Sequence, residues 1–591
     1  MTDTPPPKLT GGVQSKLRTV GLAWRDGGLS GVRTVAYAKL RHVMLTRFGL
    51  YLPEPSIKSP HLSLEFRDIP PSSTLISVIV PVHDPPKQVL EACLASVLAQ
   101  THEYWELCVC DDGSSSAEVF SVLAEYQNKD PRVRLVRSDN SLGISGASNL
   151  AAQQATGLFL AFLDHDDELH PQALAEIAHA IDGDADIDLL YTDEDKLELR
   201  GDHSDPFLKP DWSPDYLHSV MYMLHCLCVR RELFKQVGGL RPEFDGSQDY
   251  DLALRVAPVA GRIHHVPRIL YHWRKTPGSA AASPVAKPYA LSASRRALIE
   301  AAASLDPPAT VDEGLTPGTY RLRRHDRRPP VTLAIITGDP VSDVRGRGRI
   351  RVLSNFLRSI REKSTYPDYR VLVVDDGYLS PESEALLAAC GGQRASLSRD
   401  EGVAFNFSRK VNFAVGTVET EHFVLLNDDL EVISPDWIES LMDYAVEPKV
   451  AGVGGRLYFA NGNLQHAGVI VEPAGPTHVF YGMPGDRLGY YGFTHVVRNY
   501  AAVTAAVHAS TLTAFQEVGP FDETLAHDFN DVDFCLRAWE RGYRIIYTPF
   551  CELYHFEHAS LTRTAPNPEE LALFKERWRG WAEYDPFYRR V

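Results

Sequence analysis

The apolar and polar positions of this 591-residue chain form two similar series. In the first, the β-branched apolar run Thr74–Val82 (TLISVIVPV) ends at a turn that begins with His83. This pattern predicts a buried parallel strand followed by a tight turn. A helix is expected over about Gln88–Gln100 and a second strand over Trp105–Cys110, which runs directly into Asp111-Asp112-Gly113-Ser114.

The second half of the chain repeats this pattern. Thr332–Thr337 is predicted to be a strand, followed by Gly338-Asp339-Pro340. A helix is expected over about Ile350–Glu362, and a strand over Tyr369–Val374 that ends in Asp375-Asp376-Gly377. Strand–helix–strand units with right-handed crossovers build an α/β sheet whose ligands bind at the carboxyl ends of the strands. Both acidic turns fall at that edge.

Polar residues recur in the same order in the two halves, which indicates a tandem duplication. The matched pairs are Asp112 and Asp376, Asn149 and Asn412, Asp166 and Asp429, Asp249 and Asp531, and His272 and His555. The successive spacings are 37, 17, 83 and 23 residues in the first half and 36, 17, 102 and 24 in the second. Only the third interval differs by more than one residue, so the second half is expected to carry about 19 additional residues there.

The stretch from about Ala303 to Pro330 is rich in proline, glycine and charge and is the best candidate for a domain boundary. We therefore predict a basic helical N-terminal extension and two α/β domains with mostly parallel sheets, separated by a short linker. The predicted ranges are 1–73 for the extension, 74–305 for the first domain, 306–330 for the linker and 331–591 for the second domain.

Composition restricts the function classes. The formal net charge of −17 argues against nucleic-acid binding, although an acidic protein can bind phosphorylated substrates through metal ions. The eight cysteines form no Cys-x-x-Cys pair, which favours buried, reduced thiols. The start of the sequence lacks the pattern of a signal peptide, and no apolar run approaches the length of a membrane span, so we expect a cytoplasmic protein.

The first 58 residues differ from the rest, because they carry nine Lys or Arg side chains against three acidic ones. Residues 32–51 alternate apolar and basic positions in a way that predicts an amphipathic helix. Such a helix can lie on an anionic membrane surface, which would make the protein peripheral on the inner face of the cell membrane. The alternative is a helix that packs on the first domain with a solvated basic face.

Clustered acids directly follow an apolar strand in both halves. Asp164-His165-Asp166-Asp167 follows LFLAFL, and Asn427-Asp428-Asp429 follows FVLL. Carboxylates so close together repel each other unless a cation joins them, and a divalent ion there could hold a diphosphate and neutralise the charge on it as it leaves. The alternative is a solvated turn with helix-capping aspartates.

Three further kinds of residue are candidates for chemistry. Asp249 and Asp531 precede amphipathic helices, where the free N–H groups keep a carboxylate ionised, as a general base for an acceptor hydroxyl requires. A plain N-cap is the alternative. His272 and His555 both follow Leu-Tyr, which suggests a metal ligand or a phosphate contact, and Arg274 could contact a diphosphate.

Together these motifs resemble family-2 inverting glycosyltransferases of the GT-A fold, especially bacterial enzymes that build O-antigen and capsule polysaccharides. The first half contributes VIVPVHDPP, CDDGSS, GISGASNLA, FLDHDDEL, YTDEDK, GSQDYDLALR and LYHWRKTPGS, and the second half VVDDGY, LLNDDLEV, FNDVDFCLR and LYHFEHAS. The resemblance runs from about Leu75 to the C-terminus. It implies transfer of a sugar from a UDP-, dTDP- or GDP-linked donor to a glycan or lipid-linked glycan, with Mg²⁺ or Mn²⁺ as cofactor.

The resemblance also implies residue roles. The implied catalytic bases are Asp249 and Asp531, and the implied metal ligands are Asp166, His272, Asp429 and His555. The candidate nucleotide-sugar-binding residues are Val82, His83, Asp84, Asp112, Asn149, Asp164, Arg274, Thr337, Asp339, Asp376, Asn412, Asn427 and Asp428. The second half departs from the pattern at Asn427, which replaces the first Asp of the Asp-x-Asp motif, and at Thr337-Gly338-Asp339, which suggests a different nucleotide or sugar.

Several functional hypotheses are compatible with the sequence. Both domains could be active transferases, alternating as a polymerase in one variant, or one domain could be degenerate and bind the acceptor glycan. A non-catalytic nucleotide-binding scaffold would keep the Asp112 and Asp376 turns but would not need Asp249 and Asp531. A nucleotidyltransferase usually has a Gly-rich, Lys- or Arg-bearing loop after the first strand, which PVHDPP and TGDPV are not.

Overall fold

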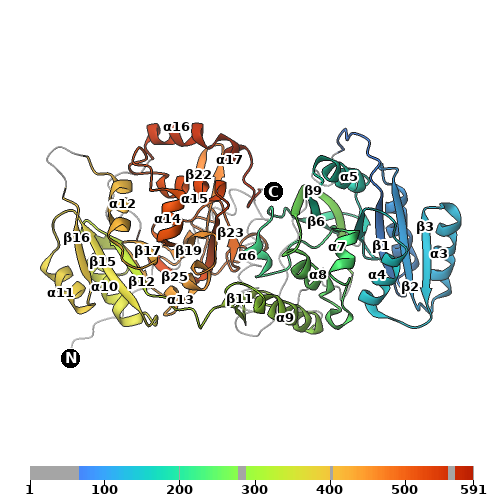
Figure 1. The fold of residues 1–591 in the computed structure, drawn as a ribbon, viewed down its shortest axis with the longest axis horizontal. Helices are drawn as coiled ribbons and strands as arrows, with labels where there is room; N and C mark the ends of the chain where they lie inside the picture. The colour runs from blue at the N-terminus through green and yellow to red at the C-terminus, as the bar shows by residue number, and fades with distance from the viewer. Residues whose placement is uncertain (1–65, 199, 277–287, 399–403, 557–565, 590–591) are drawn as a thin grey trace, which may run out of the picture.

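The computed structural model describes residues 66–198, 200–276, 288–398, 404–556 and 566–589. It forms two lobes side by side, the first coloured blue to green and the second yellow to red in Figure 1. The basic segment 1–58, its predicted amphipathic helix and its membrane contact lie outside the described residues. Among the helices of the described ranges, none is long and apolar enough to cross a membrane.

The first lobe is built on one sheet with helices on both faces. Its strands are β1 (Ile76–Val82), β2 (Trp105–Asp112), β3 (Val133–Ser138), β4 (Phe159–Phe162), β5 (Glu168–Leu169), β6 (Ile187–Leu197), β7 (His203–Phe207), β8 (Leu227–Arg230) and β9 (Arg262–Arg274). Its helices are α2 (Lys87–Leu98), α3 (Ala117–Lys129), α4 (Gly143–Gln153), α5 (Ala173–Gly183), α6 (Pro214–Leu217), α7 (Arg231–Gln236), η1 (Pro242–Phe244), α8 (Gln248–Val256) and α9 (Pro288–Ala303).

The second lobe has the same plan. Its strands are β12 (Val331–Ile336), β13 (Val341–Val344), β14 (Gly348–Arg351), β15 (Tyr369–Asp375), β16 (Gln393–Ser396), β17 (His422–Asn427), β18 (Leu430–Val432), β19 (Val450–Tyr458), β20 (Leu464–His466), β21 (Val469–Glu472), β22 (Gly475–His478), β23 (Arg498–Asn499), β24 (Val507–Thr511) and β25 (Arg544–His555). Its helices are α10 (Val352–Lys363), α11 (Pro381–Ala389), α12 (Phe407–Thr417), α13 (Trp437–Ala445), η2 (Tyr490–Gly492), α14 (Leu512–Val518), α15 (Asn530–Glu540), α16 (Pro568–Arg577) and α17 (Arg579–Glu583).

The strand orders of the two sheets confirm the duplication. The first sheet runs β3-β2-β1-β4-β8-β6-β9-β5, and the second runs β16-β15-β12-β17-β24-β19-β25-β18. The first four strands of each sheet are mutually parallel, and the pairings beyond them are mixed. Every residue of β1 is buried, as expected for a strand covered on both faces by helices. The predicted α/β class and tandem architecture are therefore confirmed.

The predicted strand and helix positions are correct to within a few residues, with two differences. Strand β2 includes Asp111 and Asp112 rather than stopping at Cys110. The hairpin β13–β14 stands between β12 and α10, where a turn alone was expected. The extra residues of the second half lie between β19 and β24, which are separated by 48 residues, whereas the equivalent β6 and β8 are separated by 29. This segment contributes β20, the hairpin β21–β22 and η2.

Residues 306–330 form a hairpin, β10 (Thr310–Glu313) with β11 (Tyr320–Arg323), so the predicted linker has structure of its own. The backbone N–H of Tyr320 donates to Ser219 of the first lobe, and Arg321 binds Asp436 and Ser440 of the second. The domain boundaries themselves stay predictions. All eight cysteines are free thiols, and seven of them are buried, as expected.

Candidate active site

A pocket of about 300 Å³ lies at the carboxyl ends of the central strands of the first lobe. It is lined by Pro81, Val82, His83, Asp112, Ser141, Gly143, Ile144, Ala147, Asp164, His165 and Asp166. Five predicted site residues therefore share one cavity: Val82, His83, Asp112, Asp164 and Asp166. Its place matches the rule that open α/β sheets bind ligands beyond the carboxyl ends of their strands.

Asp112 lines this pocket and holds the neighbouring backbone in place. Its carboxylate accepts hydrogen bonds from the backbone N–H of Leu142 at 2.6 Å and of Gly143 at 3.1 Å, and from the hydroxyl of Ser141 at 2.8 Å. These bonds tie the end of β2 to the start of α4. The carbonyl of Asp112 lies 2.8 Å from Nδ1 of His83, which holds that ring against the pocket.

Asp84 lies beside the pocket and has a structural task. It adopts a left-handed backbone conformation, and its carboxylate accepts hydrogen bonds from the N–H groups of Ser115 and Ser116. These bonds lower the pKa of the Asp84 carboxyl below its usual value. Asp339, its counterpart, is also left-handed and accepts from Ser380 and Ser383. In both lobes this aspartate, which follows the first strand, links its own loop to the loop that follows the second strand.

The acidic turn of the first lobe contains one acid that the sequence reading did not single out. Asp167 is buried and accepts hydrogen bonds from the Tyr271 hydroxyl at 2.6 Å and from the backbone N–H of Arg274 at 2.7 Å. Burial and the neighbouring charges of Asp166 and Asp164 raise the pKa of Asp167 well above its usual value. The turn therefore concentrates negative charge where a cation would relieve it.

Arg274 stabilises the acidic turn of the first lobe through two contacts. Its Nε donates to the Asp166 carbonyl at 2.8 Å, and its guanidinium pairs with Glu168. The expected contact between Arg274 and a diphosphate stays a prediction.

Asp249 lies in the first turn of α8 and lines a second cavity that shares Pro81, Ile144 and Asp164 with the first pocket. The amide of Gln248 donates to its carboxylate at 2.9 Å. Burial, followed by the charge of Asp164, raises the pKa of Asp249 to about 7. A carboxylate with that pKa beside a substrate-sized pocket has the properties of a general base.

Two groups of three potential metal ligands occur among the described residues of the first lobe. One joins Asp164 and Asp167 with His225, and the other joins Asp195 and His203 with His272. Among the described residues neither group includes Asp166, so the expected pairing of Asp166 with His272 stays a prediction. Tyr271 and His272 sit on β9 beside β5, which explains why the strand-end histidine lies next to the acidic turn.

Asn149 and Asn412 have the same structural task in the two lobes. Asn149 exchanges two hydrogen bonds with the backbone of Leu240, at 2.9 and 2.7 Å, and Asn412 does the same with Phe521, at 2.9 Å each. Neither residue lines the two cavities described above. Their recurrence is explained by a structural role, because Asn149 links α4 to the loop between α7 and η1, and Asn412 links α12 to the loop between α14 and α15. These contacts lend no support to the predicted nucleotide-sugar binding.

The nucleotide side of the second lobe is organised by a lysine. Lys410 is buried, and its Nζ donates to the Thr337 carbonyl at 2.6 Å and to the Asp376 carboxylate at 2.8 Å. Counting back from the matched asparagines, Lys410 stands where the first lobe has Ala147, which lines the pocket. The second site therefore differs from the first at the point where the nucleotide is expected.

The acidic turn of the second lobe brings three predicted residues together. Nε2 of His555 lies 3.2 Å from Oδ1 of Asp429 and 3.4 Å from the amide of Asn427. Asp428 points the other way and accepts from the Thr337 hydroxyl at 2.5 Å. Burial and the charge of Asp429 raise the pKa of Asp428 to about 7.

Asp531 occupies the helix start that corresponds to Asp249 but is held differently. Its two carboxylate oxygens accept from the backbone N–H groups of Ala505, at 2.9 Å, and Val532, at 2.8 Å. Burial raises its pKa, and these two hydrogen bonds oppose that shift. The two candidate bases therefore have different surroundings.

Sequence reasoning missed several residues of the site: His165, Asp167, Asp195, His203, His225 and Lys410. The motif FLDHDDEL contained the first two and YTDEDK the third, so their position after strands was an available signal. His203 begins β7, His225 lies between α6 and β8, and neither belongs to one of the motifs. Only the fold brings His225 next to Asp164 and Asp167, and His203 next to His272.

Two tandem α/β lobes, each with an acidic turn at a strand end and a carboxylate at a nearby helix start, have the architecture expected of glycosyltransferases. The chain belongs to Glycosyl transferase family 2, whose family model matches residues 77–238 and 348–503. The predicted family, enzyme class and tandem GT-A-type domains are confirmed by this match together with the fold.

Known relatives extend along both lobes. The chain is 39% identical over 531 residues to the uncharacterized protein y4gI of Sinorhizobium fredii. This match covers 87% of this chain and 57% of that protein. It is 36% identical over 519 residues to the O-antigen biosynthesis protein RfbC of Myxococcus xanthus, covering 87% of this chain and 40% of that protein. The chain thus spans about half the length of these relatives.

Among solved structures, Staphylococcus aureus TarS 1-349 in complex with UDP overlaps 39% of this chain and 66% of its own, at 20% identity. The TM-score is 0.32, a likeness too slight to carry an argument.

Proposed function

We propose that the chain is a tandem inverting glycosyltransferase that transfers sugars from nucleoside-diphosphate donors to a growing surface polysaccharide or lipid-linked glycan. Membership of the family supports the reaction class. The name of the relative RfbC, an O-antigen biosynthesis protein, supports the class of product. The donor nucleotide is UDP, dTDP or GDP in this proposal.

The observation that carries the proposal is the shared wall of the two cavities in the first lobe. The larger cavity has the size of a ligand pocket and reaches Asp112 on one side and Asp166 on the other. The smaller contains Asp249, and Asp164 belongs to both. An acceptor hydroxyl in the smaller cavity would lie next to the sugar of a donor in the larger, and Asp249 would take its proton as the hydroxyl attacks the anomeric carbon from the opposite face.

A divalent cation, Mg²⁺ or Mn²⁺, fits the donor set beside these cavities. The buried Oδ1 of Asp429 accepts no hydrogen bond from the part of the chain that the structure describes, and it faces Nε2 of His555, the arrangement expected of two ligands to one ion. In the first lobe Asp166 and His272 would hold the cation, together with Asp164. Bound there, the ion would offset the charge that develops on the departing diphosphate.

A specific observation favours the alternative of one active and one degenerate domain. In the second lobe Lys410 occupies the place of Ala147 and binds Asp376, and Asn427 replaces the first aspartate of the motif. The carboxylate of Asp531 is already held by two backbone N–H groups. The second lobe would then bind acceptor glycan or use a different donor.

The substitutions Asp249→Asn and Asp531→Asn decide between these versions. Each variant of the full chain is assayed for transfer and for donor hydrolysis with a panel of nucleotide sugars. If each variant loses transfer of a different sugar, both lobes are active, with loss of about 10³-fold or more at each site. If only Asp249→Asn loses activity, the second lobe is a binding domain. Full activity in both variants would overturn the proposed function.

A further inference from the structure

Asp195, His203 and His272 form a compact cluster on three neighbouring strands of the first lobe. Asp195 on β6 pairs directly with His272 on β9, and His203 begins β7. Nδ1 of His272 lies 2.7 Å from one carboxylate oxygen of Asp195, and Nδ1 of His203 lies 2.9 Å from the other. The two imidazole rings meet edge to face with centroids 4.4 Å apart.

The hydrogen bonds to Asp195 determine which ring nitrogen of each histidine carries a proton. Asp195 is completely buried, and an ionised carboxylate only accepts hydrogen bonds. Both histidines must therefore donate from Nδ1, and a neutral ring then carries its lone pair on Nε2. Each carboxylate oxygen of Asp195 is hydrogen-bonded to a different imidazole ring. The hydrogen bond from His203 therefore restrains the Asp195 carboxylate in the orientation that accepts from His272.

The second lobe indicates which ring nitrogen of this histidine faces the acidic turn. His555, the counterpart of His272, turns Nε2 toward Asp429 of the acidic turn. Strand β19 ends at the pair Tyr458 and Tyr554, so the described pairings place no β19 carboxylate opposite His555. Among the described residues, the Asp195 arrangement is therefore seen in the first lobe.

We propose that Asp195 is a positioning residue that, braced by His203, holds His272 as the tautomer whose Nε2 binds a divalent cation at the Asp164–Asp166 turn. A carboxylate behind a metal-binding histidine fixes the ring and raises its basicity, and its removal typically weakens metal binding about 10–100-fold. This inference rests on the proposed function, because it assumes a cation at that turn.

The experiment measures Mn²⁺ binding to the full chain by electron paramagnetic resonance, in an Asp429→Asn background that removes the second site. Titration gives the Kd, and electron spin echo modulation detects a directly bound imidazole nitrogen. The variants are Asp195→Asn, His203→Gln and His272→Ala. The control is Asp188→Asn, on the same strand but bonded to Arg230 and Gly261.

We expect Asp195→Asn to raise the Kd about 10–100-fold and to lose most of the nitrogen coupling, with a smaller effect from His203→Gln. His272→Ala should abolish the coupling, and Asp188→Asn should change neither quantity. Thermal melting identifies variants that do not fold, and His203→Gln, which leaves the buried carboxylate in place, then carries the test. Unchanged Kd and coupling in folded Asp195→Asn and His203→Gln would overturn the inference. Absence of Mn²⁺ binding in the background protein would instead count against the metal in the proposed function.

Discussion

At the residue scale, the two candidate bases differ in what surrounds the carboxylate. Asp249 accepts a hydrogen bond from Gln248 and faces the charge of Asp164, whereas Asp531 is held by two backbone N–H groups. Hydrogen bonds from N–H groups stabilise the charged form, and burial near a like charge destabilises it. The first base is therefore the one whose proton affinity suits catalysis near neutral pH.

This difference predicts the pH dependence of the first domain. Because the pKa of Asp249 is raised to about 7, the carboxyl is protonated below that pH and cannot accept the hydroxyl proton. In the Asp531→Asn background, kcat/KM should rise about tenfold per pH unit up to about 7 and then level off. The measurement is a rate profile from pH 5 to 9. A limb centred near pH 4 would show that the base is an ordinary exposed carboxylate.

Lys410 provides a second test at this scale. It is buried and binds Asp376, whose side chain is 24% exposed. Removing one partner of a buried ion pair costs about 3–5 kcal/mol, and partial exposure of the other reduces this, so Lys410→Met should destabilise the second lobe by about 2–3 kcal/mol. Urea unfolding measures the change. Lys449→Met, which breaks an exposed pair with Glu517, is the control and should change the free energy of unfolding far less than Lys410→Met.

How much of the site the sequence revealed depended on the kind of residue. The repeat identified Asp112, Asp166 and Asp249, because strand ends and helix starts are visible in a sequence and converge on one edge of a sheet. The repeat also selected Asn149, although its amide binds the backbone of Leu240, since structural and catalytic residues recur equally in a duplication. Lys410 was missed because its position inside a helix gave no sign that its side chain reaches Asp376.

At the element scale, the fold was predictable where apolar periodicity determines it. Strand β1 and helix α2 were located from a continuous apolar run and a turn. The hairpin β10–β11 was taken for a linker, because its sequence is rich in proline, glycine and charge. Its arginines read as solvated side chains in isolation, but they bind acids of helix α13, which lies more than 100 residues further along the chain.

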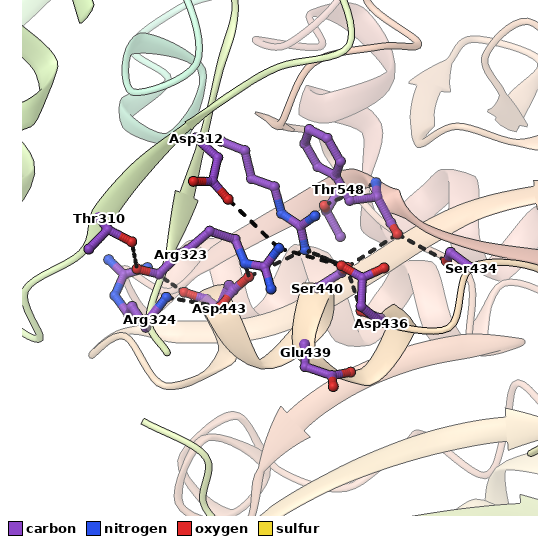
Figure 2. Close-up of polar contacts among 12 residues, drawn as sticks. Thr310, Asp312, Arg323, Arg324, Ser434, Asp436, Glu439, Ser440, Asp443 and Thr548 are labelled. Atoms are coloured by element: carbon purple, nitrogen blue, oxygen red, sulfur yellow. Dashed lines mark hydrogen bonds and ion pairs between the residues drawn. The ribbon is translucent and has the colours of Figure 1, made fainter. Parts of the chain in front are cut away.

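Figure 2 shows how this hairpin attaches to helix α13 through Asp436, Ser440 and Asp443. Asp443 is completely buried and forms ion pairs with Arg323 at 3.0 Å and Arg328 at 3.1 Å. Its carboxylate also accepts from the backbone N–H of Arg324 at 3.0 Å. A buried acid among several guanidinium groups balances charges that would otherwise repel each other.

Asp443→Asn should therefore loosen the hairpin and cost about 3–5 kcal/mol in the free energy of unfolding. The change is measured by denaturant unfolding, and proteolysis between residues 306 and 330 should become faster. Asp312→Asn is the matched control, because Asp312 is more than half exposed and lies 4.0 Å from Arg323. A control effect as large as that of Asp443→Asn would mean that the cluster acts by net charge rather than by burial.

At the scale of the whole molecule, the second lobe reaches the first beside its active site. The insertion of the second lobe carries Tyr490, whose hydroxyl donates to the Pro206 carbonyl at 2.7 Å, and Tyr491, whose ring stacks on Phe207 at 4.0 Å. The C-terminal segment runs back between the lobes (Figure 1), where Arg589 pairs with the buried Asp193. Asp193 precedes Asp195 by two residues, and Phe207 ends the strand that His203 begins.

These contacts predict that the first domain depends on the second. In the Tyr491→Ala variant, β7 loses a stacked aromatic neighbour worth about 1–3 kcal/mol, so local opening of β7 should increase roughly tenfold. Hydrogen–deuterium exchange of residues 203–207 measures the opening, and transfer by the first domain should fall while transfer by the second is unchanged. Tyr378→Ala removes an exposed tyrosine of the second lobe and should alter neither quantity. If exchange in β7 stays as in the parent protein, the interface does not brace the strand, and the two lobes work independently despite their contact.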